Sequence, residues 1–313
     1  MPTDAPVIPA ATPRNRPEPA PIFVRRLTGR DRVGRVFVYG VLIVAAALFL
    51  VPLVAMIFTS LKTMPEITAP TNTIFTPPID PTLFAWGEAW SSACIAVSCE
   101  GLRPYFVNSL IMAVFAVAIS VCIGAVNGYV LSKWRFRFDN VIFGLMLFGC
   151  FIPFQIVLIP IARVLGVMNI SGTLAGLIFV HVAYGVTFTT LFFRNFYVSV
   201  PDEIVKAARI DGAGFWSIFF LIIVPVSGPI AIVAVIWQFT SIWNDFLFGA
   251  SFGGANSRPL MVELNNLVNT STGTKSYNVD MAGAMIAALP TMLVYIVAGR
   301  YFVRGLMAGA VKG

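Results

Sequence analysis

Long apolar stretches separated by short polar segments dominate the pattern of this chain. An apolar stretch of about 20 residues is long enough to cross the hydrocarbon core of a bilayer as a helix. Strands with open edges are excluded there, because lipid cannot satisfy their hydrogen-bonding groups. The pattern therefore predicts an all-α polytopic membrane protein. Six membrane spans are expected, at about residues 36–58, 107–131, 140–162, 173–193, 222–246 and 281–303.

Composition agrees with a membrane protein and distinguishes the membrane domain from the two tails. Hydrophobic residues make up 58% of the sequence and charged residues only 11%, too few to cover a soluble core. Residues 1–21 are rich in proline and alanine and are expected to be disordered. With the basic stretch that follows, residues 1–35 form an N-terminal tail. Residues 36–303 form the membrane domain, and residues 304–313 form a C-terminal tail.

The positive residues give the spans an orientation. Six spans place both termini on one side, and sixteen of the lysines and arginines fall on that side against five on the other. Lysine and arginine concentrate on the cytoplasmic side of membrane proteins. Both termini and the 194–221 loop are therefore predicted to be cytoplasmic. The net charge of +7 has this topological reason and gives little support to a nucleic-acid partner.

Prolines and cysteines add two local expectations. Six prolines inside or at the ends of spans mark either kinks or ordinary packing irregularities. Two outer segments, about 59–106 and 247–280, are long enough to contact another protein outside the membrane. The first holds Cys94 and Cys99, which are either a short-loop disulfide in an oxidising compartment or two free thiols. The prolines concerned are Pro52, Pro153, Pro160, Pro225, Pro229 and Pro290.

One charged segment, "PDEIVKAARIDGAG" at residues 201–214, stands out in this apolar chain. Pro201 suits a first helical turn, and Asp202 and Glu203 suit the positive end of a helix dipole. Ala207 and Ala208 are small enough for another surface to approach closely. Gly212 permits a left-handed or tight turn. The segment predicts a short cytoplasmic helix, which either is an ordinary loop helix or transmits force from a soluble partner.

This segment resembles the cytoplasmic-loop signature of binding-protein-dependent ABC importer permeases, which reads Glu-Ala-Ala, three residues, Gly, nine residues, Ile-x-Leu-Pro. Ala207, Ala208, Gly212, Ile222 and Pro225 match it, whereas Lys206 stands in place of the glutamate. That departure puts one salt bridge to the ATPase in doubt. "YFVNSLIMAV", "FIPFQIVLIPIARVLGVMNISGTLAGLI", "WNDFLFG" and "RYFVRGLMAGAVKG" are also similar to permeases of the carbohydrate-uptake type. The last is similar to the end of maltose-type G subunits, and "CEGLRPYF" gives a faint likeness to glucose or mannose importers.

The resemblance implies a type I ABC importer permease fold in a bacterial or archaeal cytoplasmic membrane. It implies no catalytic residues, metal or cofactor in this chain, with ATP and Mg²⁺ bound by separate ATPase subunits. A second, non-identical permease subunit and an extracytoplasmic solute-binding protein are the other expected partners, beside membrane lipid. The C-terminal tail, with Gly309, Val311, Lys312 and Gly313, is expected to reach the ATPase. The expected ATPase-coupling residues are Pro201, Asp202, Glu203, Lys206, Ala207, Ala208, Arg209, Asp211, Gly212 and Pro225.

Polar residues near the end of the fifth span are candidates for contact with a sugar. Gln238, Trp243, Asn244 and Asp245 offer amide, indole and carboxylate groups that suit sugar hydroxyls and apolar sugar faces. Gln238 and Asp245 are seven residues apart and are expected on one helix face. Asp245 either lines the pathway or fixes the outer helix end. His181, the one histidine, makes either a helix–helix hydrogen bond or a solute contact.

Two alternatives stay open at this point. The first is an ABC importer permease for another solute, such as a polyamine or a glycerol phosphodiester. The second is a secondary transporter or a membrane scaffold, which would show inverted repeats or charged pairs within spans.

Overall fold

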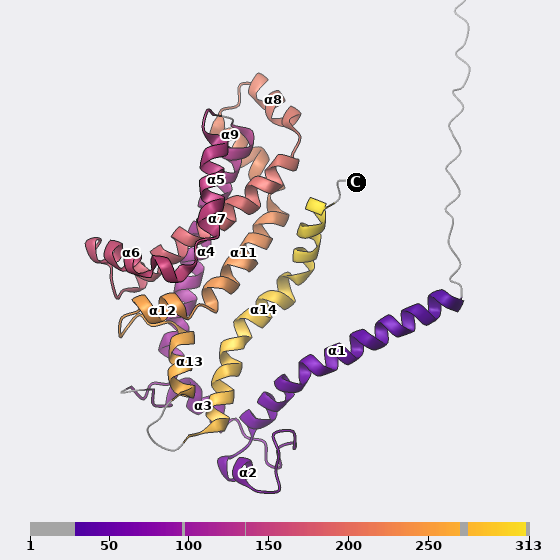
Figure 1. Ribbon diagram of the computed structural model, residues 1–313, viewed down its shortest axis with the longest axis vertical. Helices are drawn as coiled ribbons and strands as arrows, with labels where there is room; N and C mark the ends of the chain where they lie inside the picture. The colour runs from indigo at the N-terminus through magenta and orange to yellow at the C-terminus, as the bar shows by residue number, and fades with distance from the viewer. Residues whose placement is uncertain (1–28, 96–97, 135, 270–274, 311–313) are drawn as a thin grey trace, which may run out of the picture. The chain divides into compact units, whose positions relative to one another are not determined.

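The computed structural model describes residues 29–95, 98–134, 136–269 and 275–310, which are mostly helical (Figure 1). Among these residues the pairing of extended backbone is limited to one isolated bridge between Ile95 and Ser98. The predicted all-α class is therefore confirmed. The elements are α1 (Gly29–Leu61), α2 (Met64–Thr68), α3 (Phe84–Ser91), α4 (Arg103–Lys133), α5 (Asp139–Cys150), α6 (Phe154–Val167), α7 (Leu174–Ser199), α8 (Asp202–Ile210), α9 (Phe215–Ile218), the π-helix η1 (Phe219–Ile223), α10 (Val224–Val226), α11 (Gly228–Trp243), α12 (Leu247–Phe252), α13 (Leu260–Val268) and α14 (Tyr277–Ala310).

The chain divides into two units, residues 1–51 and 52–313. In the first unit, residues 1–28 of the predicted N-terminal tail lie outside the described residues, and α1 begins at Gly29. The other described helices belong to the second unit. In that unit α14 continues past the predicted end of the sixth span at residue 303, as far as Ala310.

Four of the expected spans are single apolar helices, and two are bent. Within the described residues, α1, α4, α7 and α14 are each long and apolar enough to cross a membrane. The expected span 140–162 is divided into α5 and α6, which are bent by 105°. The expected span 222–246 is divided at Ser227, with a bend of 78° between the helices on its two sides. The described helices thus supply four to six crossings, depending on whether each bent pair is one span.

Proline explains where these two bends occur. Pro153 stands directly before α6 with extended backbone, φ −58° and ψ 130°. Pro229 lies in the first turn of α11, where its missing N–H is not needed. Pro52, Pro160 and Pro290 instead lie inside α1, α6 and α14, which continue through them.

The closest helix packing in the second unit joins α4 to α7. Gly124 and Gly128 are four residues apart on α4, and both are buried against α7. A methyl group added to Gly128 would lie 2.6 Å from the Cβ of Phe193. The hydroxyl of Thr189 donates to the carbonyl of Ser120 at 2.8 Å across the same contact. Small residues at this spacing let two membrane helices approach closely.

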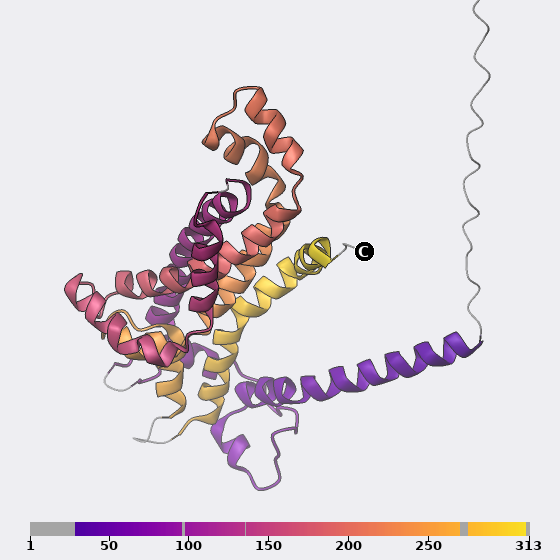
Figure 2. The same cartoon turned by 45° about the horizontal axis from the view of Figure 1, so that its top comes forward.

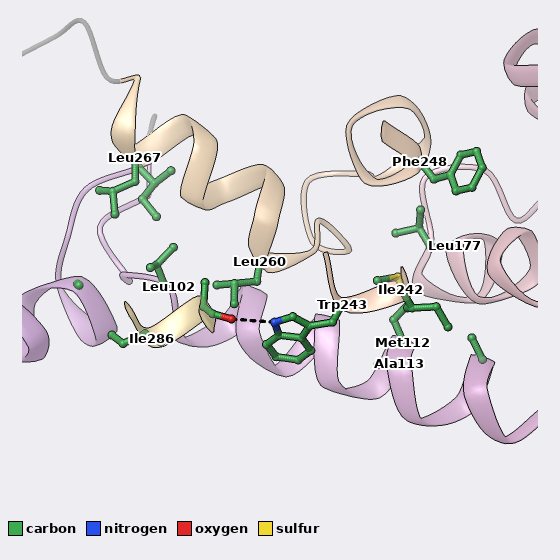
Figure 3. Packing of buried hydrophobic residues seen from close by; sticks show 14 of the residues in the cluster. Leu102, Met112, Ala113, Leu177, Ile242, Trp243, Phe248, Leu260, Leu267 and Ile286 are labelled. Atoms are coloured by element: carbon green, nitrogen blue, oxygen red, sulfur yellow. Dashed lines mark hydrogen bonds between the residues drawn. The ribbon is translucent and has the colours of Figure 1, made fainter. Parts of the chain in front are cut away.

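A hydrophobic core joins α4, α7 and α11 to α3 and α14 (Figure 3). Trp243 is fully buried in it, and its indole Nε1 donates to the carbonyl of Ala287 at 2.9 Å (Figure 3). Phe106 packs edge-on against the same indole, with ring centroids 5.2 Å apart. Trp243 therefore fixes the end of α11 to α4 and α14.

The second unit has two structurally different ends. Figures 1 and 2 show α8 and α9 at one end, and α3 and α13 at the other. A disulfide joins Cys94 to Cys99 directly after α3. The charged helix and the disulfide thus lie at opposite ends of the unit.

Candidate functional site

The charged segment folds as the short helix predicted from its sequence. α8 follows Pro201, has Asp202 and Glu203 in its first turn, and carries Arg209 in its last turn. Gly212 then adopts φ +84°, which confirms the turn predicted there. The N–H of Gly212 donates to the carbonyl of Arg209 at 3.0 Å, and the N–H of Ala213 donates to that of Ala208 at 2.9 Å. This pair of bonds is a Schellman termination, which depends on a residue that tolerates the left-handed conformation.

Two basic side chains clamp α8 to the end of α4. The Lys133 ammonium donates to the carboxylate of Asp202 at 2.6 Å and to the carbonyl of Val200. In return, the Arg209 guanidinium donates to the carbonyl of Lys133 at 3.1 Å and lies 4.0 Å from the ring centroid of Trp134. α8 is thus held at both of its ends by one short segment. From the sequence alone Lys133 was one of the sixteen positive residues on the predicted cytoplasmic side, and its contact with α8 was not predicted.

The buried face of α8 belongs to a second apolar cluster. Val205 is buried in it and joins Tyr129 of α4, Tyr197 of α7 and Phe219 of η1. The hydroxyls of Tyr197 and Ser227 share a hydrogen bond of 2.8 Å. The helix therefore contacts the end of α4 directly and shares an apolar cluster with η1 and the start of α11.

The opposite face of α8 is exposed. Ile204 and Ile210 are 45% and 86% exposed, and Glu203, Lys206 and Ala207 are exposed beside them. Of the two small residues expected to face a partner, Ala207 lies on this face, whereas Ala208 packs toward the apolar cluster. The exposed face thus presents two large apolar side chains, Ile204 and Ile210, among charged residues.

Replacing Lys133 by methionine tests the clamp. The variant removes the bonds to Asp202 and Val200 but keeps an apolar side chain of similar length. We expect amide hydrogen exchange across residues 201–213 to become about tenfold faster, because the first turn of α8 opens more readily. Lys133→Arg retains a donor and should exchange nearly as the parent does. Equal exchange in the parent and in Lys133→Met would contradict the clamp.

A separate cavity of about 490 Å³ lies where α6, α7, α11 and the segment after α11 meet. Gln238, Asn244 and Asp245 line it, as proposed for a solute pathway. Trp243 does not line it, because its ring is buried in the core described above. The polar or amphipathic residues lining the cavity are Gln155, His181, Tyr184, Trp237, Gln238, Ser241, Asn244 and Asp245.

Trp237 takes the place expected for Trp243. It is half-buried, lines the cavity, and packs 4.5 Å from the ring of Phe188. Trp237 and Trp243 are six residues apart, which turns their side chains by about 240° around a helix. The neighbouring Gln238, a cavity residue, was the signal that could have identified Trp237.

Asp245 lies beyond the end of α11 rather than on the helix face shared with Gln238. α11 ends at Trp243, and the carboxylate of Asp245 accepts the N–H groups of Phe248 at 3.3 Å and Gly249 at 3.0 Å. Asp245 therefore fixes the first turn of α12 and also lines the cavity, while its role in a solute pathway stays a prediction.

His181 lies across the cavity wall from Asp245. Its Nε2 is 3.6 Å from the nearer Asp245 oxygen, too far for a hydrogen bond. The amide of Gln238 donates to the carbonyl of His181 at 3.2 Å and to the hydroxyl of Ser120 at 3.3 Å. The helix–helix bond at His181 involves its backbone carbonyl, whereas the Nε2 of its side chain makes no hydrogen bond within the described residues and lies beside Asp245.

Comparison with known proteins identifies the family to which a chain with this fold and these sites belongs. Residues 120–306, more than half of the chain, match the family described as binding-protein-dependent transport system inner membrane component. The chain belongs to this family. The match covers α8 and the cavity, so both candidate sites belong to the family domain. Members of the family are transport components of a membrane, and this permease is accordingly a multi-pass membrane protein.

Alignments with individual relatives cover nearly the whole of this permease. It is 39% identical over 283 residues to a probable ABC transporter permease protein of Pyrococcus horikoshii, covering 89% of this chain and 98% of the relative. It is 32% identical to a xylose/arabinose import permease protein of Haloferax volcanii, covering 88% and 93%. A solved bacterial ABC transporter involved in the import of the acidic polysaccharide alginate shares the fold, with a TM-score of 0.74, 21% identity, and coverage of 88% and 98%. The expected type I importer fold therefore holds.

The remaining predicted site residues lie at the C-terminus. Gly309 is in the last turn of α14, whereas Val311, Lys312 and Gly313 lie outside the described residues.

Proposed function

We propose that this chain is the permease subunit of an ATP-driven, binding-protein-dependent sugar importer and forms half of its translocation pathway. The observation that carries the proposal is α8, a helix bonded to the end of α4 at one end of the membrane unit, with an exposed face of apolar and charged residues, in a member of this transport family. Sugar as the solute is supported by the xylose/arabinose permease and by a melibiose/raffinose/stachyose import permease protein of Bacillus subtilis, 30% identical over 273 residues.

The proposed orientation places α8 and the chain termini in the cytoplasm. The excess of lysine and arginine in the tails and in the 132–139 and 194–221 loops supports it. The disulfide at the end opposite to α8 supports it as well, because disulfides persist in oxidising compartments. The outer end, with α3 and α13, is then available to an extracytoplasmic binding protein.

In the proposed mechanism ATP and Mg²⁺ bind to separate ATPase subunits, whose surface receives the exposed face of α8. Closure of the ATPase pair displaces α8. The clamp through Lys133 and Arg209 carries the displacement to α4, and the apolar cluster around Val205 carries it to η1 and α11. The membrane helices thereby change between two arrangements that the nucleotide biases. A second, non-identical permease subunit completes the pathway, and the C-terminal tail adds a further ATPase contact.

Photo-crosslinking at Ile210 tests this mechanism. A benzophenone amino acid at this exposed position should capture an ATP-binding subunit of the purified importer, and the yield should depend on nucleotide. The matched control is Ile79, which is 72% exposed but belongs to the outer segment. Capture of the ATPase from Ile79, or of no ATP-binding protein from Ile210, would refute the proposed coupling.

The cavity gives the proposed solute pathway its chemistry. Gln238, Asn244, Asp245 and Ser241 supply hydrogen-bonding groups, and Trp237 supplies a half-buried aromatic ring. Such a combination suits the hydroxyls and apolar faces of a sugar. Family membership leaves no support for a secondary transporter or a scaffold.

A further inference from the structure

The charge of the cavity is unbalanced. Asp245 contributes a carboxylate, and none of the described residues that line the cavity is a lysine or an arginine. Its carboxylate is held in place by the N–H groups of Phe248 and Gly249, so it does not swing away freely. A solute with a carboxylate or phosphate group would meet a fixed like charge without a cation to compensate it. An uncharged solute meets no such penalty.

His181 supplies an unused polar atom beside this carboxylate. The side chain is 6% exposed, and its Nε2 has no hydrogen-bond partner among the described residues. The ring packs edge-on against Phe248, with centroids 5.6 Å apart, and the backbone is fixed by Gln238. A buried polar atom without a partner is costly and calls for an explanation. Nε2 is itself buried, so a ligand group that enters beside Asp245 would supply a partner after a small shift of the imidazole ring.

A hydroxyl group fits this position chemically. It can donate its proton to the carboxylate of Asp245 and interact through its oxygen with Nε2 of His181. A carboxylate or phosphate oxygen lacks the proton that Asp245 requires.

We propose that Asp245 and His181 form a hydroxyl-binding subsite for an uncharged sugar, and that Asp245 discriminates against sugars bearing a carboxylate or phosphate. This inference rests on the proposed sugar-import function. It states that this subunit contacts the solute directly and that the solute is uncharged. The shared fold decides neither point. The alginate importer with the same fold is named for an acidic polysaccharide.

The charge of the cavity can be measured without knowledge of the solute. Ser241 is exposed and lines the cavity, so Ser241→Cys provides a reporter thiol once the free cysteines Cys122 and Cys150 are replaced by serine. In the purified full chain, and relative to their rates with a free thiol in solution, a cationic methanethiosulfonate should react about tenfold faster than an anionic one. Asp245→Asn should bring the two rates close together. Equal rates with Asp245 intact would overturn the discrimination.

Asp80→Asn is the matched control for charge. Asp80 is exposed and does not line the cavity, so the same chemical change there should leave the ratio of rates unaltered. A ratio that falls equally in Asp80→Asn and Asp245→Asn would also count against the proposal.

Uptake in proteoliposomes tests the hydroxyl contact. The complete importer, with its ATPase, partner permease and binding protein, is assayed with xylose, melibiose and raffinose, and the sugar with the highest ATP-dependent uptake is retained. Asp245→Ala is expected to lower sugar transported per ATP hydrolysed by about tenfold, the effect of losing a hydrogen bond to a charged group. His181→Ala should lower it less, and His181→Gln should recover part of the loss.

Two readouts separate this subsite from the importer function as a whole. Stimulation of the ATPase by loaded binding protein should stay within about twofold of the parent in all three variants, since the solute contact rather than coupling is changed. Equal losses of ATPase stimulation and uptake would show a structural role and overturn the subsite. Failure of the proposed function would instead appear in the parent, as the absence of ATP-dependent uptake of any of the three sugars.

Discussion

Gly212→Val is expected to lower ATP-driven uptake by at least about tenfold while membrane insertion stays normal. Gly212 adopts φ +84°, a conformation that costs a β-branched residue about 1–3 kcal/mol. A side chain here would meet nothing within 4 Å, so the penalty comes from the backbone rather than from a clash. The strained turn would release the end of α8 and shift its exposed face. Uptake and ATPase stimulation in proteoliposomes should both fall at least about tenfold, because docking and coupling use the same helix.

A neighbouring glycine provides the control. Gly214 also has open space around it, but its backbone is ordinary and extended, with φ −78° and ψ 176°. Gly214→Val should retain most of the uptake, and Gly212→Asn should retain more than Gly212→Val, because asparagine tolerates the left-handed conformation. Similar losses at Gly212 and Gly214 would show that bulk in the loop, rather than the turn, is what matters.

Gly124→Ala is expected to destabilise the second unit by about 1–3 kcal/mol, the usual cost of overpacking. The added methyl would lie 2.6 Å from the Cβ of Thr189 and also close to its hydroxyl and backbone, so α4 and α7 would have to separate. The hydrogen bond from Thr189 to Ser120 lies in the same contact and would lengthen with it. In detergent, the midpoint of thermal unfolding should fall by several degrees, and the double variant with Gly128→Ala should fall further.

Gly144→Ala is the matched substitution on a neighbouring helix. Gly144 lies in α5, and an added methyl there meets nothing within 4 Å. Since alanine favours helix over glycine, this variant should be no less stable than the parent. An unchanged midpoint in Gly124→Ala would mean that the two helices are not in close contact.

The sequence was most informative where one segment could be judged alone. The apolar stretches identified the membrane class, and the spans formed by α4, α7 and α14 lie close to their predicted ranges. Pro201, the acidic first turn and Gly212 predicted α8 and its end, because caps and turns depend on local backbone chemistry. Prolines marked kinks as one alternative in the third and fifth predicted spans, and both spans are bent. The sequence did not show which prolines bend the chain, since Pro52, Pro160 and Pro290 lie inside helices that continue through them.

The candidate site residues show the same limit: residue chemistry can be judged from one segment, but the position of a side chain in the fold cannot. Gln238, Asn244 and Asp245 were identified from residue chemistry, and they line the cavity. Trp243 has equally suitable chemistry but is buried in the core, while Trp237 lines the cavity. Gly124 and Gly128 had a recognisable four-residue spacing, yet only their contact with α7 shows what that spacing does.

The sequence by itself determined three properties of individual segments. These are which stretches prefer lipid to water, which loops and tails carry the positive charge, and where a helix starts and stops. These properties arise from transfer free energies and backbone preferences of residues that are neighbours in the chain. The tertiary structure alone decided which side chains meet. His181 and Asp245 are 64 positions apart in the sequence. The distance of 3.6 Å between Nε2 of His181 and Oδ2 of Asp245 depends on how α7 packs against the end of α11. Contacts of this kind depend on the rotation and crossing of whole helices, which no single segment encodes.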